Sequence, residues 1–252
     1  MFCSILLLAS WAADPFLLEP GDLETQRWAQ YLLEDRGADT RDALQNARHY
    51  VPEFKTIFRN AGLPEDLVWI ALVESGFRRD AVSATGAVGM YQFKVITGRA
   101  FGLVIDRHKD QRLDPIASAK AAARYLRYLR QKFSSWELTL AAYNLGEGDL
   151  RRIMAQNDAQ HWHQVRQFVR PQTQHYLYKI RAAAIIGNDF LNHHPLALAE
   201  GERVYLVQRG DTLYSIAKRF KISVERIVAH NQLEDSQIRP GRHLVLPPPE
   251  IR

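Results

Sequence analysis

Residues 63–76 read LPEDLVWIALVESG and decide the fold of the region around them. Pro64 followed by two acids is typical of a helix start, because proline suits the first turn and acids favour the positive end of the helix dipole. The stretch then repeats at helical spacing i, i+3, i+4 and i+7, with Leu67, Ile70, Ala71 and Glu74. Gly76 can end the helix. The sequence therefore predicts a helix with a carboxylate on its apolar face.

Helical periodicity continues on both sides of this stretch. Leu44, Ala47 and Val51 begin one helix before it, and Pro52 lies at its end or at the start of the next. Further helices are predicted after Asp114, from Ser135 to Gly146, and over residues 174–190. We expect a mainly α domain over residues 14–192.

The composition changes after a short connection over residues 193–203. Residues 204–207 read VYLV and favour a strand, and two short helical patterns follow from Leu213 and from Val224. A turn over 238–241 and a strand over 243–246 end the unit. The sequence predicts a small β-α-α-β domain over residues 204–248.

Charge and cysteine content narrow the class of protein. The net charge of +5 and pI near 9.3 suit an anionic polymer, but scattered basic residues argue against nucleic-acid binding. Cys3 is the single cysteine, which excludes an intrachain disulfide. Residues 5–12 read ILLLASWA and indicate a truncated secretory signal within residues 1–13, hence export. The sequence leaves membrane attachment open.

Glu74 has two interpretations. A carboxylate on an apolar helix face is costly unless it is paired or protonated, so Arg78 or Arg79 could satisfy it as a structural residue. Alternatively, desolvation raises its pKa and makes it a general acid near neutral pH. The nearest downstream acid, Asp80, is interpreted as a solvated turn residue.

Three blocks of sequence sharpen this choice: ESGF at 74–77, AVSATGAVGMYQF at 81–93 and AAYNLG at 141–146. In this order they resemble the signature blocks of the family 1 lytic transglycosylases. GLP at 62–64, GRAFGL at 98–103 and DQRLDP at 110–115 resemble the membrane-bound lytic murein transglycosylase D group in particular. The resemblance implies a lysozyme-like fold and cleavage of the β-1,4 bond between N-acetylmuramic acid and N-acetylglucosamine in peptidoglycan.

The same resemblance implies the roles of individual residues. Glu74 acts first as acid and then as base, and the muramic C6 hydroxyl closes a 1,6-anhydro ring. The side chains expected to contact substrate are Ser83, Tyr91, Gln92, Tyr143 and Asn144. Tyr143 is expected to direct its hydroxyl toward Glu74, and Asn144 has an equal structural interpretation as a holder of the loop. Two positions depart from the family pattern. Tyr91 stands where tryptophan or methionine is usual, and Gln172 stands where glutamate is usual.

The last unit resembles a LysM module, through YLVQRGDTLYSIA at 205–217 and IRPGRHLVLP at 238–247. Such modules bind N-acetylglucosamine units, which implies a groove formed by Gly210, Asp211, Thr212, Leu213, Ile238, Pro240 and Gly241. Asp211 or Thr212 has an alternative role as a helix cap. We therefore expect an exported, monomeric enzyme of the bacterial periplasm or cell envelope that acts on peptidoglycan strands.

No cofactor, metal or nucleic acid is expected. The close histidine pairs His161/His163 and His193/His194 lack a further ligand. Two alternatives stay open: a hydrolytic muramidase of the goose-lysozyme type, and an inactive scaffold that only binds peptidoglycan. Product mass distinguishes the muramidase from the transglycosylase, because the anhydro product is lighter than the hydrolytic product by one water.

Overall fold

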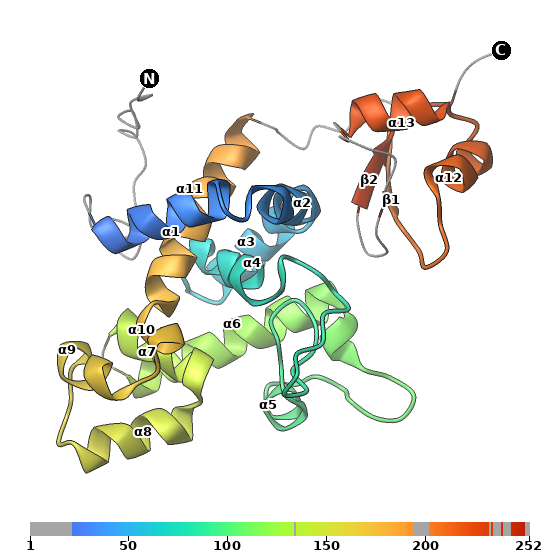
Figure 1. The fold of residues 1–252 in the computed structure, drawn as a ribbon. Helices are drawn as coiled ribbons and strands as arrows, with labels where there is room; N and C mark the ends of the chain where they lie inside the picture. Colours follow the sequence, from blue (N-terminus) through green and yellow to red (C-terminus); the bar gives the residue numbers. More distant parts are fainter. Residues whose placement is uncertain are drawn as a thin grey trace.

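The computed structural model describes residues 22–133, 135–193, 202–231, 233, 238 and 243–249. The predicted signal segment and Cys3 lie outside these residues. Among the described residues, no helix is both long and apolar enough to cross a bilayer. The predicted mainly helical character of the first domain is confirmed (Figure 1).

The α-helices of the first domain range in length from four residues in α9 and α10 to 18 residues in α6 and α11. The α-helices are α1 (Leu23–Leu33), α2 (Gly37–Ala47), α3 (Val51–Asn60), α4 (Ile70–Ser75), α5 (Val95–Ala100), α6 (Pro115–Lys132), α7 (Trp136–Leu145), α8 (Glu147–Gln156), α9 (Trp162–Val165), α10 (Pro171–Gln174) and α11 (Tyr176–His193). Short 3-10 turns cover Glu65–Trp69, Gln111–Leu113 and Arg166–Phe168. Pro52 lies in the first turn of α3, so it belongs to the start of the second helix and not to the end of the first.

The stretch that decides the fold departs from prediction in one respect. Its first turn, Glu65–Trp69, is a 3-10 helix, and the α-helix begins only at Ile70. The break does not rotate the apolar side chains out of the core, since Leu67, Ile70 and Ala71 are all fully buried. Gly76 ends α4 in the left-handed conformation, as predicted, with φ of +62°.

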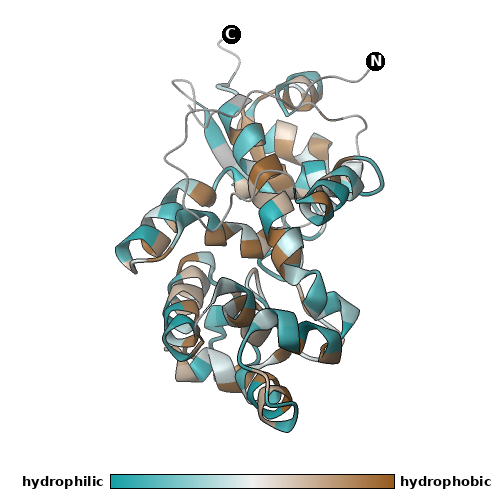
Figure 2. Ribbon diagram, turned by 90° about the vertical axis from the view of Figure 1, so that its left-hand side faces the viewer, coloured by the Kyte–Doolittle hydropathy of each residue, from teal (hydrophilic) through white to brown (hydrophobic). Residues whose placement is uncertain are grey.

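α11 is the element around which the first domain is assembled. It packs against α1, α4 and α7, and α6 lies against α3 and α7. Its inward side chains join a large core with those of α3 and α4, including Phe54, Phe58 and Ile180. The individual helices carry both hydrophilic and hydrophobic residues, as an amphipathic surface helix requires (Figure 2).

The C-terminal unit has the predicted order of elements. β1 (Arg203–Leu206) pairs antiparallel with β2 (His243–Leu246), in a register that places Arg203 opposite Leu246. Between them lie α12 (Leu213–Phe220) and α13 (Val224–His230). Val207, Ile216, Ile227 and Leu244 form a separate small core. The boundaries proposed from the sequence stay predictions, because residues 194–201 lie outside the described chain.

Candidate active site

Glu74 lies in the last turn of α4, where the chain is anchored from two sides. The next residue, Ser75, donates from its buried Oγ to the carbonyl oxygen of Met90 at 2.9 Å and to that of Ala71 at 3.1 Å. The first of these bonds ties the end of α4 to the loop over residues 81–93. Because the helix end and this loop are fixed to one another, the direction in which the Glu74 side chain leaves the helix is also fixed.

The Glu74 side chain opens into a cleft of about 740 Å³. Helices α1, α2, α4, α7 and α11 contribute to its walls, together with the segment after α4 and Gln172 of α10. The polar and aromatic residues that line it include Trp28, Tyr31, Arg36, Asp39, Asp42, Glu74, Arg78, Asp80, Asn144, Gln172, Tyr176 and Lys179. A cleft of this size accepts several sugar rings or a short peptide.

The environment of Glu74 favours its protonated form. The residue keeps partial access to solvent, but protein atoms crowd around the carboxyl group, and this desolvation raises its pKa to about 7 from an ordinary value of 4.5. Two neighbours oppose the shift: Tyr176, whose hydroxyl donates to Oε1, and the positive charge of Lys179. Arg78 does not pair with Glu74, since its guanidinium donates to the carbonyl of Ser75 at 3.1 Å. The geometry therefore favours the acid interpretation over a structural ion pair.

Tyr176 occupies the position that the sequence assigned to Tyr143. The Tyr143 hydroxyl donates to the carbonyl oxygen of Tyr91 at 2.9 Å and so stabilises the loop rather than the carboxyl group of Glu74. Tyr176, at the start of α11, supplies the phenol that contacts Glu74. A weak sequence signal for Tyr176 is its spacing of three residues from Lys179, which puts both side chains on one face of a helix.

The side chain of Tyr91 does not line the cleft, which corrects the predicted substrate contact. Tyr91 is only 1% exposed, and its ring packs between Phe54 and Phe58, with centroids 5.9 and 6.1 Å away. Its contribution to the site is its backbone carbonyl, which receives the Tyr143 hydroxyl. The residue type at this position thus affects the core under the loop.

Ser83 and Gln92 hold the loop together. The Ser83 Oγ accepts from the amide of Ala87 at 2.9 Å, and the Gln92 Nε2 donates to the carbonyls of Gly89 and Ala81 at 2.8 and 3.2 Å. Gln92 adopts a φ of +51°, which these bonds maintain. Neither residue is among those that line the cleft around Glu74. Their predicted sugar contacts stay predictions.

Arg112 also stabilises the loop over residues 81–93. Its buried guanidinium pairs with Asp110, at 2.6 Å between Nη2 and Oδ2, and donates to the carbonyls of Gly86 and Phe93 at 3.3 and 3.2 Å. The Arg112 backbone lies so close to Gly89 that a Cβ there would approach its carbonyl oxygen to 1.9 Å. The blocks 81–93 and 110–115 therefore form one packed unit.

Asn144 and Gln172 both line the cleft. The Asn144 Oδ1 accepts from the Thr173 hydroxyl at 2.8 Å, a bond that links α7 to α10. Asn144 therefore has the structural role expected for it, and its predicted substrate contact stays a prediction. Gln172 places an uncharged amide where the related pattern has a carboxylate.

The C-terminal unit uses several of its predicted groove residues for its own stability. Asp211 accepts from the amide of Gln208 and from the Tyr205 hydroxyl, both at 2.7 Å, and these bonds lower the pKa of its carboxyl group. Thr212 caps α12 by accepting from the Ser215 amide, which is the alternative role expected for it.

Five predicted groove residues remain; the structure describes three of them, and one of these needs correction. Leu213 is 3% exposed in the small core, so only its backbone can face a ligand. Gly210 has a φ of +90° in the exposed turn before α12, and Ile238 packs partly buried against the core. Pro240 and Gly241 lie outside the described residues.

These features define a class: a mainly helical domain, with the partly buried Glu74 carboxyl group and its raised pKa in a cleft, followed by a β-α-α-β unit. Known family patterns agree. Residues 54–165 match the Transglycosylase SLT domain and residues 205–247 match the LysM domain. The chain therefore contains an SLT domain followed by a LysM domain, and the predicted mainly α class with a small β-α-α-β module is confirmed.

Individual proteins are similar to parts of this chain. The chain is 38% identical over 119 residues to membrane-bound lytic murein transglycosylase D of Escherichia coli, a match covering 47% of this chain and 26% of that protein. It is 47% identical over 83 residues to peptidoglycan transglycosylase gp16 of Escherichia phage T7, covering 32% and 6%. A lytic transglycosylase Slt structure from Pseudomonas aeruginosa aligns with a TM-score of 0.45 and 25% identity, covering 57% and 24%. The chain thus spans a small part of these relatives.

Proposed function

We propose that this protein is a peptidoglycan lytic transglycosylase and that Glu74 is its catalytic residue. The observation that carries the proposal is the position of Glu74: a carboxyl group with a pKa near 7, contacted by one phenol, at the wall of a cleft large enough for a glycan strand. The SLT match and the names of the relatives support the same activity.

A pKa near 7 suits a group that gives and then takes a proton. Protonated Glu74 donates to the oxygen bridging muramic acid and N-acetylglucosamine, and the C1–O bond breaks with the electron pair going to that oxygen. The resulting carboxylate then removes the proton of the C6 hydroxyl while the C6 oxygen bonds to C1. Glu74 ends protonated, and no water is consumed. The Tyr176 hydroxyl stabilises the carboxylate that exists between the two steps.

The arrangement of acids favours this reaction over hydrolysis. A hydrolytic enzyme ordinarily needs a second carboxylate as nucleophile or base. Asp80 lines the same cleft, so a muramidase that uses Asp80 to activate water is the second candidate. However, Asp80 is exposed and comes from the turn after α4, as the sequence predicted, whereas an internal C6 nucleophile needs no second acid.

Digestion of purified glycan strands, followed by mass measurement, tests both candidates. We expect products lighter by one water than the hydrolytic ones, and we expect Glu74→Gln to abolish cleavage. Asp80→Asn should leave activity largely intact under the transglycosylase proposal and abolish it under the muramidase alternative. Products with reducing ends alone, or full activity of Glu74→Gln, would refute the proposal. An inactive scaffold would release no product at all.

We also propose that the C-terminal module binds the same polymer, through N-acetylglucosamine units. A second weak site on one strand raises the local concentration of cleavable bonds. Both domains would then act on peptidoglycan, and we propose that the protein works in the cell envelope after export. We also propose that it is a monomer. Removing residues 202–252 should lower binding to insoluble peptidoglycan while leaving the cleavage of short soluble strands intact, in a sedimentation assay.

A further inference from the structure

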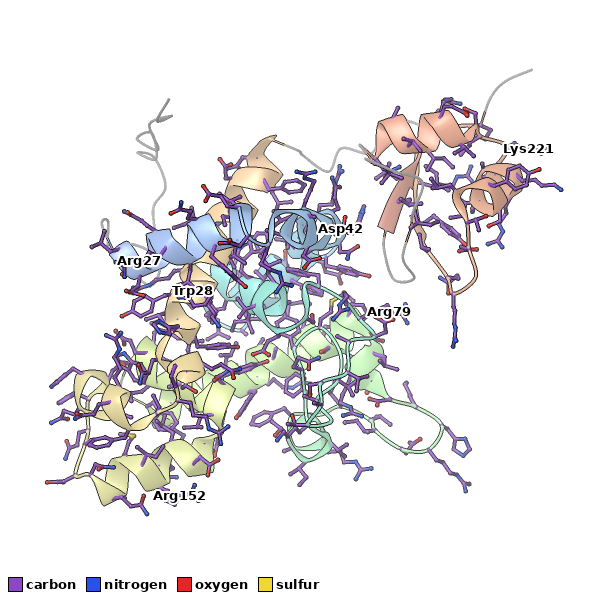
Figure 3. The ribbon with its side chains drawn as sticks, viewed as in Figure 1. Arg27, Trp28, Asp42, Arg79, Arg152 and Lys221 are labelled. Carbon is purple, nitrogen blue, oxygen red and sulfur yellow. The ribbon has the colours of Figure 1, made fainter. Side chains whose placement is uncertain are left out.

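Lys179 lies in the cleft, where its ammonium group contacts the ring of Trp28. It is on α11, three residues after Tyr176, and both residues line the cleft with Glu74. Its ammonium nitrogen lies 4.3 Å from the centroid of the Trp28 ring, a cation–π contact between α11 and α1. Trp28 is labelled in Figure 3. Within the described part of the chain, Lys179 forms no ion pair with a carboxylate.

The charge of Lys179 nevertheless reaches Glu74. It is the charged group among the described residues that acts on the carboxyl group, and the effect is mutual, because Glu74 in turn opposes the lowering of the Lys179 pKa by burial. The ammonium is therefore near the acid but outside the 4.0 Å range of an ion pair. A direct ion pair would hold Glu74 as a carboxylate and prevent it from donating a proton.

We propose that Trp28 and Lys179 are a positioning pair for Glu74, in which the indole holds the ammonium inside the cleft but out of ion-pair contact with the carboxyl group. The inference rests on the proposed function of Glu74. At this distance the ammonium stabilises the carboxylate formed after proton donation without preventing the first protonation. Trp28 precedes residue 54, so this control comes from a segment ahead of the matched SLT domain.

Other ionisable groups around the cleft belong to the same electrostatic environment. Those that line it are Arg36, Asp39, Asp42, Arg78, Asp80, Tyr31 and Tyr176; beside them lie His175 against Trp28, Glu24 against His175, and Tyr143 near Glu74. Arg36 pairs with Asp39 at 2.7 Å, and Arg78 donates to a backbone carbonyl. None of these charged groups replaces Lys179 as the cation acting on Glu74.

The proposal predicts shifts of opposite sign for two substitutions. Lys179→Met removes the positive charge, so the pKa of Glu74 should rise. Trp28→Leu frees the ammonium to approach the carboxylate across the cleft, so the pKa of Glu74 should fall. We expect roughly half a pH unit or more in each direction. The double variant should behave as Lys179→Met, because Trp28 acts only through Lys179.

The experiment titrates Glu74 in the full-length protein by NMR with ¹³C-labelled glutamate, with the Glu74 signal assigned by its absence in Glu74→Gln. This measurement needs no turnover, so it judges the pair even if the proposed function fails. The pH profile of kcat/KM on glycan strands is then recorded, and its falling limb should move in the same directions as the titration. Trp28→Tyr keeps an aromatic face and should retain the titration of the native protein.

Lys132→Met is the matched control, since Lys132 makes a cation–π contact of 5.3 Å with Tyr128 away from the cleft. It removes the same charge and should leave Glu74 unchanged. Shifts of the same sign in Lys179→Met and Trp28→Leu, or no shift in either variant, would overturn the proposal. So would a higher KM for Lys179→Met with an unmoved pH limb, which would indicate a plain sugar contact.

Discussion

Replacing Gly89 by alanine tests the packing of the loop that supports Glu74. Gly89 has φ of +84°, and its added Cβ would lie 1.9 Å from the carbonyl oxygen of Arg112, a backbone atom that cannot rotate away. Gly86, in the same loop, has φ of +80° and no heavy atom within 4 Å of the added Cβ. The two glycines therefore separate the conformational cost of alanine from the steric cost.

The expected magnitudes follow from these two geometries. Alanine in the left-handed region costs about 1–2 kcal/mol, which is the whole expected effect for Gly86→Ala. Gly89→Ala adds a backbone displacement, for which overpacking in a dense interior gives about 1–3 kcal/mol more. We expect Gly89→Ala to lower the free energy of unfolding by about 2–5 kcal/mol in total.

Urea unfolding followed by tryptophan fluorescence measures this difference. All five tryptophans of the sequence precede residue 163, and none lies in the LysM domain, so the signal reports the helical domain alone. The unfolding midpoint should fall further for Gly89→Ala than for Gly86→Ala at an unchanged slope. Equal losses for the two variants would refute the close contact with Arg112. A loss confined to Gly86→Ala would contradict the assigned geometry of the loop.

Three further changes test the site itself. The pKa of Glu74 is raised to about 7 in the folded protein from 4.5, so its stabilising contribution is present below pH 4.5 and lost as the pH rises through 7. Glu74→Gln should thus be more stable than the native protein at pH 8, by at most about 3 kcal/mol, and similar at pH 4, in urea unfolding. Tyr176→Phe removes a bond to the carboxylate, so the pKa of Glu74 and the falling limb of kcat/KM should move upward; an unmoved limb contradicts this. Ser75→Ala leaves the Met90 carbonyl without its 2.9 Å partner and should cost about 1–3 kcal/mol by thermal unfolding, whereas an unchanged midpoint would exclude a role for this bond.

Local sequence patterns determined the helices and strands and the position of Glu74 on its helix. The apolar stripe of residues 67–74, the glycine at 76 and the caps at Asp114 and Ser135 all act within about one helical turn, so their effects can be predicted from neighbouring residues. The same holds for the β-α-α-β order of the last unit. The motif blocks indicated the resemblance to the lytic transglycosylases and singled out Glu74 as the candidate acid.

Tertiary packing decided which side chains surround Glu74. The contact between Tyr176 and Glu74 spans 102 positions of sequence, and its existence depends on how α11 packs against α4. The approach of Trp28 to Lys179 likewise requires α1 to lie along α11. The burial of Tyr91 depends on Phe54 and Phe58 of α3 filling the space beneath the loop. Periodicity shows that a residue faces the interior, but the neighbours it meets there are determined by the packing of distant helices.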